Sequence, residues 1–372
     1  MTREEILDKV LSTQEDIILE LATSFGKSRM VIEKIKKDKP ESIVIFVPKL
    51  VLIDNWKREF IKWEATDYLN KVYFSTYRSM DKVEGYFDMI IMDESHGLTD
   101  RCKDLLEYIE ARTFMFLSAT LSREQVDYFK SVFQAKHIKA TLSDGFDNGT
   151  LPTPTFVHHK LSIDSVPGVF RFHKGNKTTK VCKFKDRWAY IKAKKPVIIE
   201  CSAREYLYLL DEKVEYLKKR YFQTKLEPMK KSWLKASGDR LKWLGSLKNG
   251  YIQGLLDNLV DKRCLVFCIS IAQAEDICPY PIVSSRDDAM QILNDFNRGK
   301  INHISACNIL NEGISLSECE IGIFASINSS EVMQVQKCGR ILRHKEPKIH
   351  LVYFKGTREE EIVKTMLENY NS

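Results

Sequence analysis

The chain has 372 residues, of which 44% are hydrophobic and 29% are charged, and its formal net charge is +7 at pH 7. This composition is typical of a globular protein and excludes a disordered or fibrous chain. The length favours two or three domains, each large enough to bury a core. No apolar run approaches the roughly 18 residues that cross a bilayer, and the opening segment MTREEILDKV lacks the features of a signal peptide. We therefore expect a cytoplasmic protein that has no membrane partner.

Short apolar runs alternate with stretches of helical spacing over residues 1–145. The runs are DIILELA (16–22), SIVIFVP (42–48), KVYFST (71–76), FDMIIMD (87–93) and TFMFLSAT (113–120). Their near-continuous hydrophobicity predicts strands that are buried on both faces, as in a parallel sheet covered by helices. Residues 1–145 are therefore predicted to form a doubly wound α/β domain.

The same pattern returns over residues 259–372. Its apolar runs are CLVFCIS (264–270), NHISACN (302–308), EIGIFAS (320–326) and KIHLVYF (348–354). They predict a second α/β domain with a parallel sheet. Residues 146–258, which lie between the two domains, are predicted to form a linker, a basic hairpin-like insertion and amphipathic helices. The nine cysteines of the chain include no C-x-x-C pair, which favours buried reduced thiols over a zinc site.

The segment ELATSFGKSRMV (20–31) is a candidate phosphate-binding loop. The P-loop pattern is G-x-x-x-x-G-K-[ST], and here Ala22 stands at the first glycine while Gly26, Lys27 and Ser28 complete the end. An apolar strand precedes the loop and a helix follows from about Lys27, so backbone N–H groups would face the phosphates. Lys27 would neutralise the β- and γ-phosphates, and the Ser28 hydroxyl would bind Mg²⁺.

An acidic pair follows a neighbouring strand in the segment FDMIIMDESHG. Asp93 is a candidate ligand of Mg²⁺, and Glu94 is a candidate base that orients and deprotonates the attacking water. By itself an Asp-Glu pair after a strand is more often a helix N-cap. The phosphate loop earlier in the chain favours the catalytic interpretation.

Phosphoryl transfer also needs a cation that stabilises the charge of its transition state. The segment QVQKCGRILR contains Gln336, Arg340 and Arg343, and the two arginines lie on one face of a helix. Gly339, between them, permits close approach of the backbone. Two arginines on a surface helix are the ordinary alternative, but these belong to the second α/β domain, where they can reach across a cleft.

In this arrangement of motifs the chain resembles a superfamily 2 helicase of the DExH-box type, similar to type III restriction-like and phage branch-migration helicases. The segments that carry the resemblance follow the family's order: ATSFGKS, FVPKLVLIDNW, STYRS, DESH, SAT, CLVFCIS, SACNILNEGISL and QKCGRILR. The resemblance implies two RecA-like domains, ATP in the cleft between them and nucleic acid across their tops.

The resemblance also implies roles for individual positions. The nucleotide-binding positions are Thr23, Gly26, Lys27, Ser28, Arg29, Glu312 and Gly313, with Ser28 and Asp93 at the metal. The catalytic positions are Lys27, Glu94, Gln336, Arg340 and Arg343. The positions that couple nucleotide state to domain movement are His96, Ser118 and Thr120. The positions that contact the nucleic-acid backbone are Lys49, Thr76, Ser270 and Asn308.

Several positions depart from the family's pattern or are less certain in role. Ser24 replaces a usual glycine of the phosphate loop, and Ser315 stands where the family often has aspartate. Gln14 lies too close to Lys27 for a normal adenine-reading glutamine, so we expect it to be a surface residue. Arg240 and Lys248 resemble positions that face the ATPase cleft in relatives.

The segment 171–195 is strongly basic, with ten Lys and Arg against the single acid Asp186. FRFHKGNKTTKVCKF predicts a β-hairpin that turns at KGNK, with aromatic residues interleaved. Basic groups and aromatic faces together are typical of single-strand binding. The candidate contacts are Lys174, Lys177, Lys183 and Trp188. The alternative is an exposed insertion whose aromatic residues only anchor it.

We predict an ATP- and Mg²⁺-dependent motor that works as a monomer and acts on DNA in preference to RNA. Its substrate would be forked or branched DNA, its candidate partners replication or recombination proteins, and its context a phage or mobile element. Two alternatives stay open. One is a duplex translocase that does not separate strands, and the other is a nucleic-acid-binding ATP switch that serves a partner protein.

Overall fold

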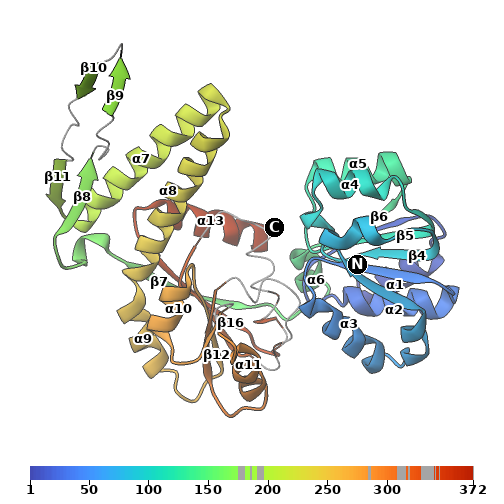
Figure 1. Cartoon of the computed structure of the whole chain (residues 1–372). Helices are drawn as coiled ribbons and strands as arrows, with labels where there is room; N and C mark the ends of the chain where they lie inside the picture. The colour runs from blue at the N-terminus through green and yellow to red at the C-terminus, as the bar shows by residue number, and fades with distance from the viewer. Residues whose placement is uncertain are drawn as a thin grey trace.

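Two parallel six-stranded sheets organise the chain, one in each of two α/β domains (Figure 1). The structure is a computed structural model. It describes residues 1–174, 181–184, 187–190, 197–283, 286–307, 316, 319–327, 339, 341–342 and 344–371. The predicted fold class, two doubly wound parallel-sheet domains, is confirmed by this arrangement.

The first sheet has the strand order β3-β2-β4-β5-β1-β6, and its strand pairs are parallel. Its strands are β1 (Ile17–Leu21), β2 (Ile43–Val47), β3 (Val72–Thr76), β4 (Tyr86–Met92), β5 (Glu110–Ser118) and β6 (Lys136–Ala140). The helices of this domain are α1 (Arg3–Ser12), α2 (Lys27–Asp38), α3 (Val51–Lys62), α4 (Asp100–Leu106), α5 (Arg123–Phe133) and α6 (Leu142–Asp147). Short 3₁₀ turns cover Thr66–Lys71, Tyr77–Lys82 and Ser95–Gly97.

Helices cover both faces of the first sheet, because successive residues of a strand point to opposite faces. Leu19 of β1 belongs to the core that α1, α2 and α3 complete, whereas Ile18 belongs to the core under α4 and α5. The five residues of β1 are all buried, as are those of β2. This burial explains why the sequence of β2 is apolar without alternation, and why that of β1 is apolar except for Glu20, which pairs with His137 and Lys139 of β6.

The second sheet has the strand order β13-β14-β12-β15-β16-β7, again with parallel pairs. Its strands are β7 (Thr155–Leu161), β12 (Cys264–Phe267), β13 (Pro281–Ile282), β14 (His303–Ala306), β15 (Ile321–Phe324) and β16 (Lys348–Phe354). The helices around it are α9 (Asn249–Asp257), α10 (Ile271–Ile277), α11 (Ala289–Asn297) and α13 (Arg358–Asn371). β7 comes from the stretch between the two domains and adds an edge strand beside β16.

The turn after α6 joins the two domains. Asn148 Nδ2 donates to the carbonyl of Met1 at 2.6 Å, and Leu151 N donates to the carbonyl of Gly145 at 2.9 Å. A Cβ added to Gly145 would lie 2.7 Å from Leu151 and 2.9 Å from Phe25 of the phosphate loop. The connection between the domains is therefore packed against the loop, and α6 also contacts α13 of the second domain.

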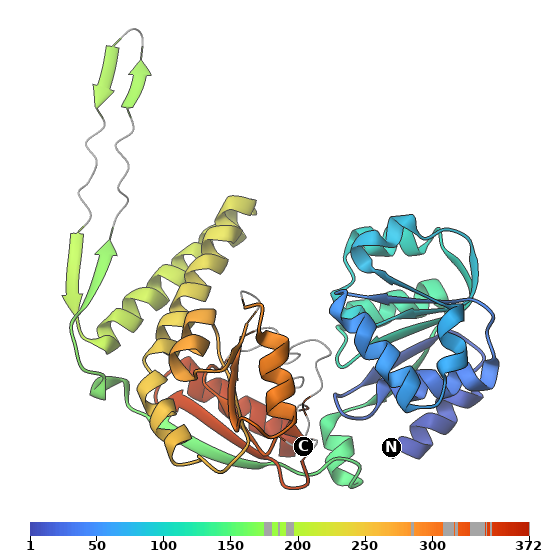
Figure 2. The same ribbon diagram turned by 60° about the horizontal axis from the view of Figure 1, so that its bottom comes forward.

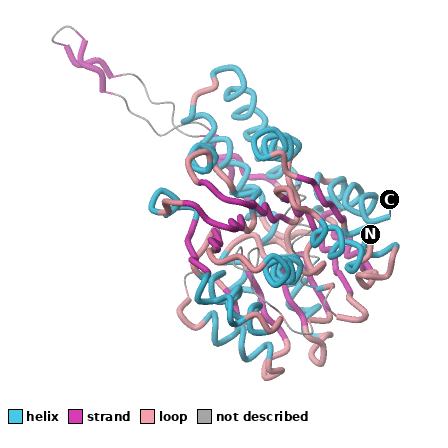
Figure 3. Tube along the Cα trace, turned by 90° about the vertical axis from the view of Figure 1, so that its right-hand side faces the viewer, coloured by secondary structure: helices cyan, strands magenta, loops and turns pink. Residues whose placement is uncertain are grey.

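A two-stranded ribbon and a long helical pair project from the second domain (Figures 1 and 2). The ribbon pairs β8 (Phe170–Lys174) with β11 (Val197–Cys201), and a separate hairpin pairs β9 (Val181–Phe184) with β10 (Arg187–Tyr190). Helices α7 (Ala203–Thr224) and α8 (Glu227–Ser246) lie beside the ribbon. Figure 3 shows β9 and β10 at the far end of this projection. A short 3₁₀ turn at Ile163–Ser165 precedes it.

The predicted hairpin that turns at KGNK, residues 174–177, is wrong in its strand pairing, and residues 175–177 themselves lie outside the described residues. Phe172 pairs with Ile199 and Lys174 pairs with Val197, so β8 pairs with β11 and not with β9. β9 instead pairs with β10, with Phe184 opposite Arg187. The long-range partner β11 replaces the local partner that the spacing suggested.

Lys248 is a buried cation in the second domain and does not face the ATPase cleft as its resemblance implied. Its Nζ donates to the carbonyls of Ala325 and Val352, at 3.2 and 3.1 Å, and to Glu359 Oε1 at 2.6 Å. Glu359 Oε2 accepts from the backbone N–H of Phe354 at 3.1 Å. Both charges are therefore fully engaged inside the fold, where they tie α13 to the ends of β15 and β16.

Arg240 does not face the cleft either. It is buried on α8 and pairs with Asp211 of α7, so it holds the two long helices together. The seven cysteines whose side chains are described are buried and free. Within the described ranges, none of the helices is both long and apolar enough to cross a membrane.

Replacing Lys248 with alanine is expected to destabilise the second domain by about 3–5 kcal/mol, because the Glu359 carboxylate would stay buried without its partner. Urea denaturation followed by circular dichroism measures the loss. Lys262→Ala is the matched control, since Lys262 is 48% exposed and pairs with Glu320 at the surface; its cost should be about 0–1 kcal/mol. Equal costs for the two variants would contradict the role of the buried pair.

Candidate nucleotide cleft

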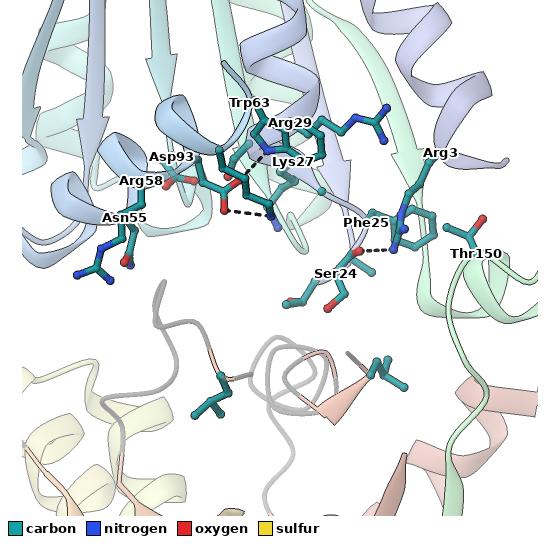
Figure 4. A pocket seen from close by; sticks show the side chains of 18 of the residues that line it. Arg3, Ser24, Phe25, Lys27, Arg29, Asn55, Arg58, Trp63, Asp93 and Thr150 are labelled. Carbon is teal, nitrogen blue, oxygen red and sulfur yellow. Dashed lines mark hydrogen bonds and ion pairs between the residues drawn. The ribbon is translucent and has the colours of Figure 1, made fainter. Parts of the chain in front are cut away.

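A cleft of about 1240 Å³ lies at the carboxyl edge of the first sheet and is lined by both domains. The residues that line it from the first domain include Arg3, Thr23, Lys27, Arg29, Asn55, Trp56, Arg58, Lys62, Trp63, Asp93, Glu94 and Thr150. Those from the second domain are Leu316, Leu342, His344 and Lys345. Figure 4 shows Lys27 at the centre, with Asp93 to one side and Arg3 and Thr150 to the other. Most charged groups of the lining are cationic, which suits a polyanion such as a triphosphate.

The phosphate loop connects β1 to α2. The left-handed backbone of Gly26, with φ 91°, turns the chain into α2, which begins at Lys27. The first N–H groups of a helix have no partner within the helix and can face an anion. Lys27 Nζ donates to the carbonyl of Leu21 at 3.1 Å, so the ammonium group is held at the mouth of the loop. This local structure agrees with the strand, loop and helix that the sequence predicted.

Asp93 follows the last residue of β4 and is held from three sides. Trp56 Nε1 on α3 donates to Asp93 Oδ2 at 2.9 Å, and the N–H of Glu94 donates to Asp93 Oδ1 at 3.0 Å. The Tyr77 hydroxyl donates to the backbone carbonyl of Asp93. These hydrogen bonds orient the carboxylate, because a change of its rotamer would leave Trp56 Nε1 and the Glu94 N–H without an acceptor.

Burial raises the pKa of Asp93 to about 6, and the neighbouring charge of Glu94 acts in the same direction. The Trp56 hydrogen bond, the charge of Lys27 and the Glu94 N–H oppose this rise. A buried carboxylate with a raised pKa gains when a cation joins it. Asp93 and the neighbouring Ser28 hydroxyl therefore have the chemistry that Mg²⁺ requires, two hard oxygen donors beside a phosphate site.

The predicted coupling residues lie in one chain of contacts that begins with the contact between Glu94 and His96. His96 Nδ1 is 3.3 Å from Glu94 Oε2 and 3.1 Å from Ser118 Oγ at the end of β5. Ser118 Oγ donates to the carbonyl of Thr120 at 2.7 Å. Gln125 Nε2 of α5 donates to the carbonyl of His96 at 2.9 Å. A movement at Glu94 would therefore reach the end of β5 through direct contacts.

Of the four positions predicted to contact the nucleic-acid backbone, three are described. Lys49 follows β2 and is exposed, Thr76 ends β3, and Ser270 follows β12, where its side chain caps α10 by accepting from Gln273 N. All three lie at the carboxyl edges of their sheets, where α/β folds bind ligands. Gln14 is exposed and does not line the cleft, in agreement with its expected place at the surface.

Part of the predicted site lies outside the described residues. These positions are Lys177, Asn308, Glu312, Gly313, Ser315, Gln336, Arg340 and Arg343. Lys174, Lys183 and Trp188 are placed only as members of strands. Their roles remain predictions.

Sequence analysis missed several residues of the cleft. Arg3 donates through Nη2 to the carbonyl of Ser24 at 2.9 Å, Trp56 and Tyr77 hold Asp93, and Gln125 holds His96. Tyr77 stands inside the segment STYRS and Trp56 ends the segment FVPKLVLIDNW, so both belong to segments that carry the family resemblance. Arg3 and Gln125 belong to helices whose spacing gives no sign of which face meets the cleft.

Comparisons with known proteins agree with this architecture. Residues 2–123 match the family described as "Type III restriction enzyme, res subunit", and residues 247–345 match the "Helicase conserved C-terminal domain". A search of curated proteins finds no match. The Hef helicase domain of Pyrococcus furiosus is 14% identical with a TM-score of 0.52, covering 98% of this chain and 97% of that one. S. cerevisiae Dbp5, bound to RNA and ADP BeF3, is 9% identical with a TM-score of 0.60, covering 99% of this chain and 86% of that one.

The two family matches indicate an ATP-hydrolysing nucleic-acid helicase, and the two RecA-like domains are in keeping with this class. Together with the likeness to the Hef helicase domain, they support a superfamily 2 helicase of the type III restriction-like kind. The family prediction made from the order of the motifs is therefore confirmed.

The affinity for Mg²⁺ with ADP is expected to fall as the pH drops through about 6, because the deprotonated form of Asp93, the candidate ligand of the ion, is lost below its pKa. Trp56→Phe removes a hydrogen bond that lowers this pKa, so the fall should begin at a higher pH. A fluorescent ADP analogue, titrated between pH about 5 and about 8, measures both effects. Asp93→Asn should bind weakly at every pH. A wild-type affinity that stays constant over this range would contradict the assignment.

Proposed function

We propose that the chain is an ATP- and Mg²⁺-dependent motor that acts on DNA and separates its strands at forks or branched structures in replication, recombination or repair. The observation that carries the proposal is the cleft, which Lys27, Asp93 and Glu94 line from one domain and Leu342, His344 and Lys345 line from the other, with Gly339 in contact with Ser24. A site shared by two domains makes hydrolysis depend on their contact, which is what a motor requires.

In the proposed mechanism, Lys27 and the N–H groups at the start of α2 bind the β- and γ-phosphates. Mg²⁺, bound by Ser28 and Asp93, would neutralise phosphate charge. Glu94 orients the attacking water and accepts its proton. Arg340 and Arg343 stabilise the charge of the transition state from the second domain.

Two observations support nucleic acid as the track and favour DNA. Lys49, Thr76 and Ser270 lie at the carboxyl edges of the sheets, where contacts to phosphates would grip a strand without reading its sequence. The name of the matched family, a restriction enzyme subunit, supports DNA, whereas the Dbp5 structure contains RNA. We propose the basic arm of β8 to β11 as the part that contacts separated strands.

ATP hydrolysis in the presence of Mg²⁺ is expected to rise by about tenfold or more with one form of DNA, since grip on the track and closure of the cleft are linked. The measurement compares no nucleic acid, single-stranded, duplex and forked DNA, and RNA, with Lys27→Ala as the inactive control. Stimulation by RNA alone would contradict the choice of DNA. Stimulation by duplex without strand displacement would identify a translocase, and hydrolysis that ignores every nucleic acid would favour a switch that serves a partner protein.

Removing the distal part of the arm is expected to reduce strand displacement by about tenfold or more, because stacking on unpaired bases contributes about 1–3 kcal/mol per base. Lys174 and Val197 are paired neighbours, so an Asn-Gly turn can replace residues 175–196 and keep the β8–β11 ribbon intact. Hydrolysis without nucleic acid should stay within about twofold of wild type, since none of the arm's described residues lines the cleft. Unchanged strand displacement would contradict the role of the arm.

A further inference from the structure

Ser24 stands in the phosphate loop with a backbone that serine disfavours. Its φ is 76°, in the left-handed region. Glycine adopts this region without steric cost, whereas a residue with a Cβ does not. Gly26, two residues on, has φ 91°. The two positive φ values shape the turn that leads into α2, so the loop keeps its conformation only if something holds Ser24 in place.

Two contacts from outside the loop hold Ser24. Its Oγ donates to the carbonyl of Gly339, in the second domain, at 2.6 Å. Its own carbonyl accepts from Arg3 Nη2, on α1, at 2.9 Å. The hydrogen bond between Ser24 and Gly339 joins residues 315 apart in the sequence. It forms only when the second domain lies against the loop.

The partner segment is fitted closely on both sides. A Cβ added to Gly339 would lie 2.2 Å from Thr23 Cβ, so the backbone at Gly339 touches the phosphate loop directly. A Cβ added to Gly322 of β15 would lie 2.7 Å from Ile341 Cγ1, so Ile341 is seated on the second sheet. Gly339 thus packs against the phosphate loop while Ile341, two residues on, packs against the second sheet. The carbonyl of Gly339, which accepts from Ser24, must therefore move with the second domain.

We infer that Ser24 is a positioning residue that makes the phosphate-binding conformation of the loop depend on contact with the second domain. When the contact opens, the hydroxyl loses Gly339 and the backbone at Ser24 is free to relax to negative φ, which turns the peptide groups that lead to Gly26. When the contact forms, the loop is held ready for phosphates. By linkage, nucleotide in the loop strengthens the contact between the domains to the same extent.

This inference rests on the proposed binding of ATP phosphates by the 22–28 loop and adds a dependence that the glycine of the usual pattern would not give. Glycine at this position would keep the left-handed backbone without help. Serine needs its hydrogen bond across the cleft to hold the same backbone. Serine at this position, in place of the family's glycine, therefore couples nucleotide binding to contact between the domains.

The test compares Ser24→Ala with Ser24→Gly, because both remove the hydroxyl and only alanine keeps the backbone preference of serine. The probe is a fluorescent ADP analogue with Mg²⁺, titrated without nucleic acid. Ser24→Ala is expected to bind about fivefold more weakly than wild type, the effect of one hydrogen bond. Ser24→Gly should stay within about twofold of wild type, because relief of the backbone offsets the lost bond.

Gly339→Ala tests the same contact from the other domain. Its methyl group would collide with Thr23 and push the segment away, so the affinity of the otherwise wild-type chain for ADP should fall by about fivefold. In the Ser24→Gly background the same change should have no effect, since the loop no longer depends on the contact. Thermal unfolding of each variant confirms that it is folded.

The outcomes separate the inference from the proposed function. Lys27→Ala should lose most ADP binding. If it binds as well as wild type, the loop does not hold the phosphates, and the proposed function fails together with the inference. If Lys27→Ala is weak but Ser24→Ala binds like wild type, the inference alone is overturned. A loss from Gly339→Ala that is equal in the wild-type and Ser24→Gly backgrounds also overturns it.

Discussion

The burial of one carboxylate, that of Asp93, is the constraint on which the first domain's half of the site depends. The end of β4 places this group where water is scarce, and burial makes the charge costly. Trp56 and the Glu94 N–H fix its two oxygens, and Lys27 supplies the opposing charge. The free-energy cost of the buried Asp93 charge falls when a cation binds beside it, so the site favours binding of a cation.

The sequence identifies strands that are buried on both faces better than strands at an edge. The run that became β2 is apolar throughout, and the runs that became β1, β4 and β16 are apolar except for Glu20, Asp88, Lys348 and His350, so a local sequence pattern detects them. β6, with the sequence KHIKA, and β7, with TFVHHKL, are richer in polar residues, and each lies at an edge of its sheet. Neither was predicted. A local pattern does not show that the seven residues of β7 will pair with β16 and extend the second sheet.

The same division holds at the site. Lys27 and Asp93 could be named as candidates because the proposed chemistry needs a loop and an acid directly after buried strands, and that order is visible along the chain. Both residues line the cleft. Trp56 and Arg3 were missed because their function arises from which face of a helix meets the cleft. The β8–β11 ribbon was missed for a related reason: a local hairpin at KGNK fits the spacing, but a partner more than twenty residues away completes the ladder.

The non-glycine residues with positive φ in the cleft are Ser24 and Glu94, among the residues whose backbone is described. Each is in contact with another part of the protein. Ser24 contacts Gly339 of the second domain, and Glu94 contacts His96, which in turn contacts Ser118 at the end of β5. Strain of this kind persists only where surrounding contacts impose it. In the cleft, backbone strain therefore lies at the two points where, in the proposed mechanism, bound nucleotide would act on the rest of the protein: on the other domain at Ser24, and on the first sheet at Glu94. In that mechanism a loop held by the other domain and a proposed base linked through His96 to β5 would couple hydrolysis to movement.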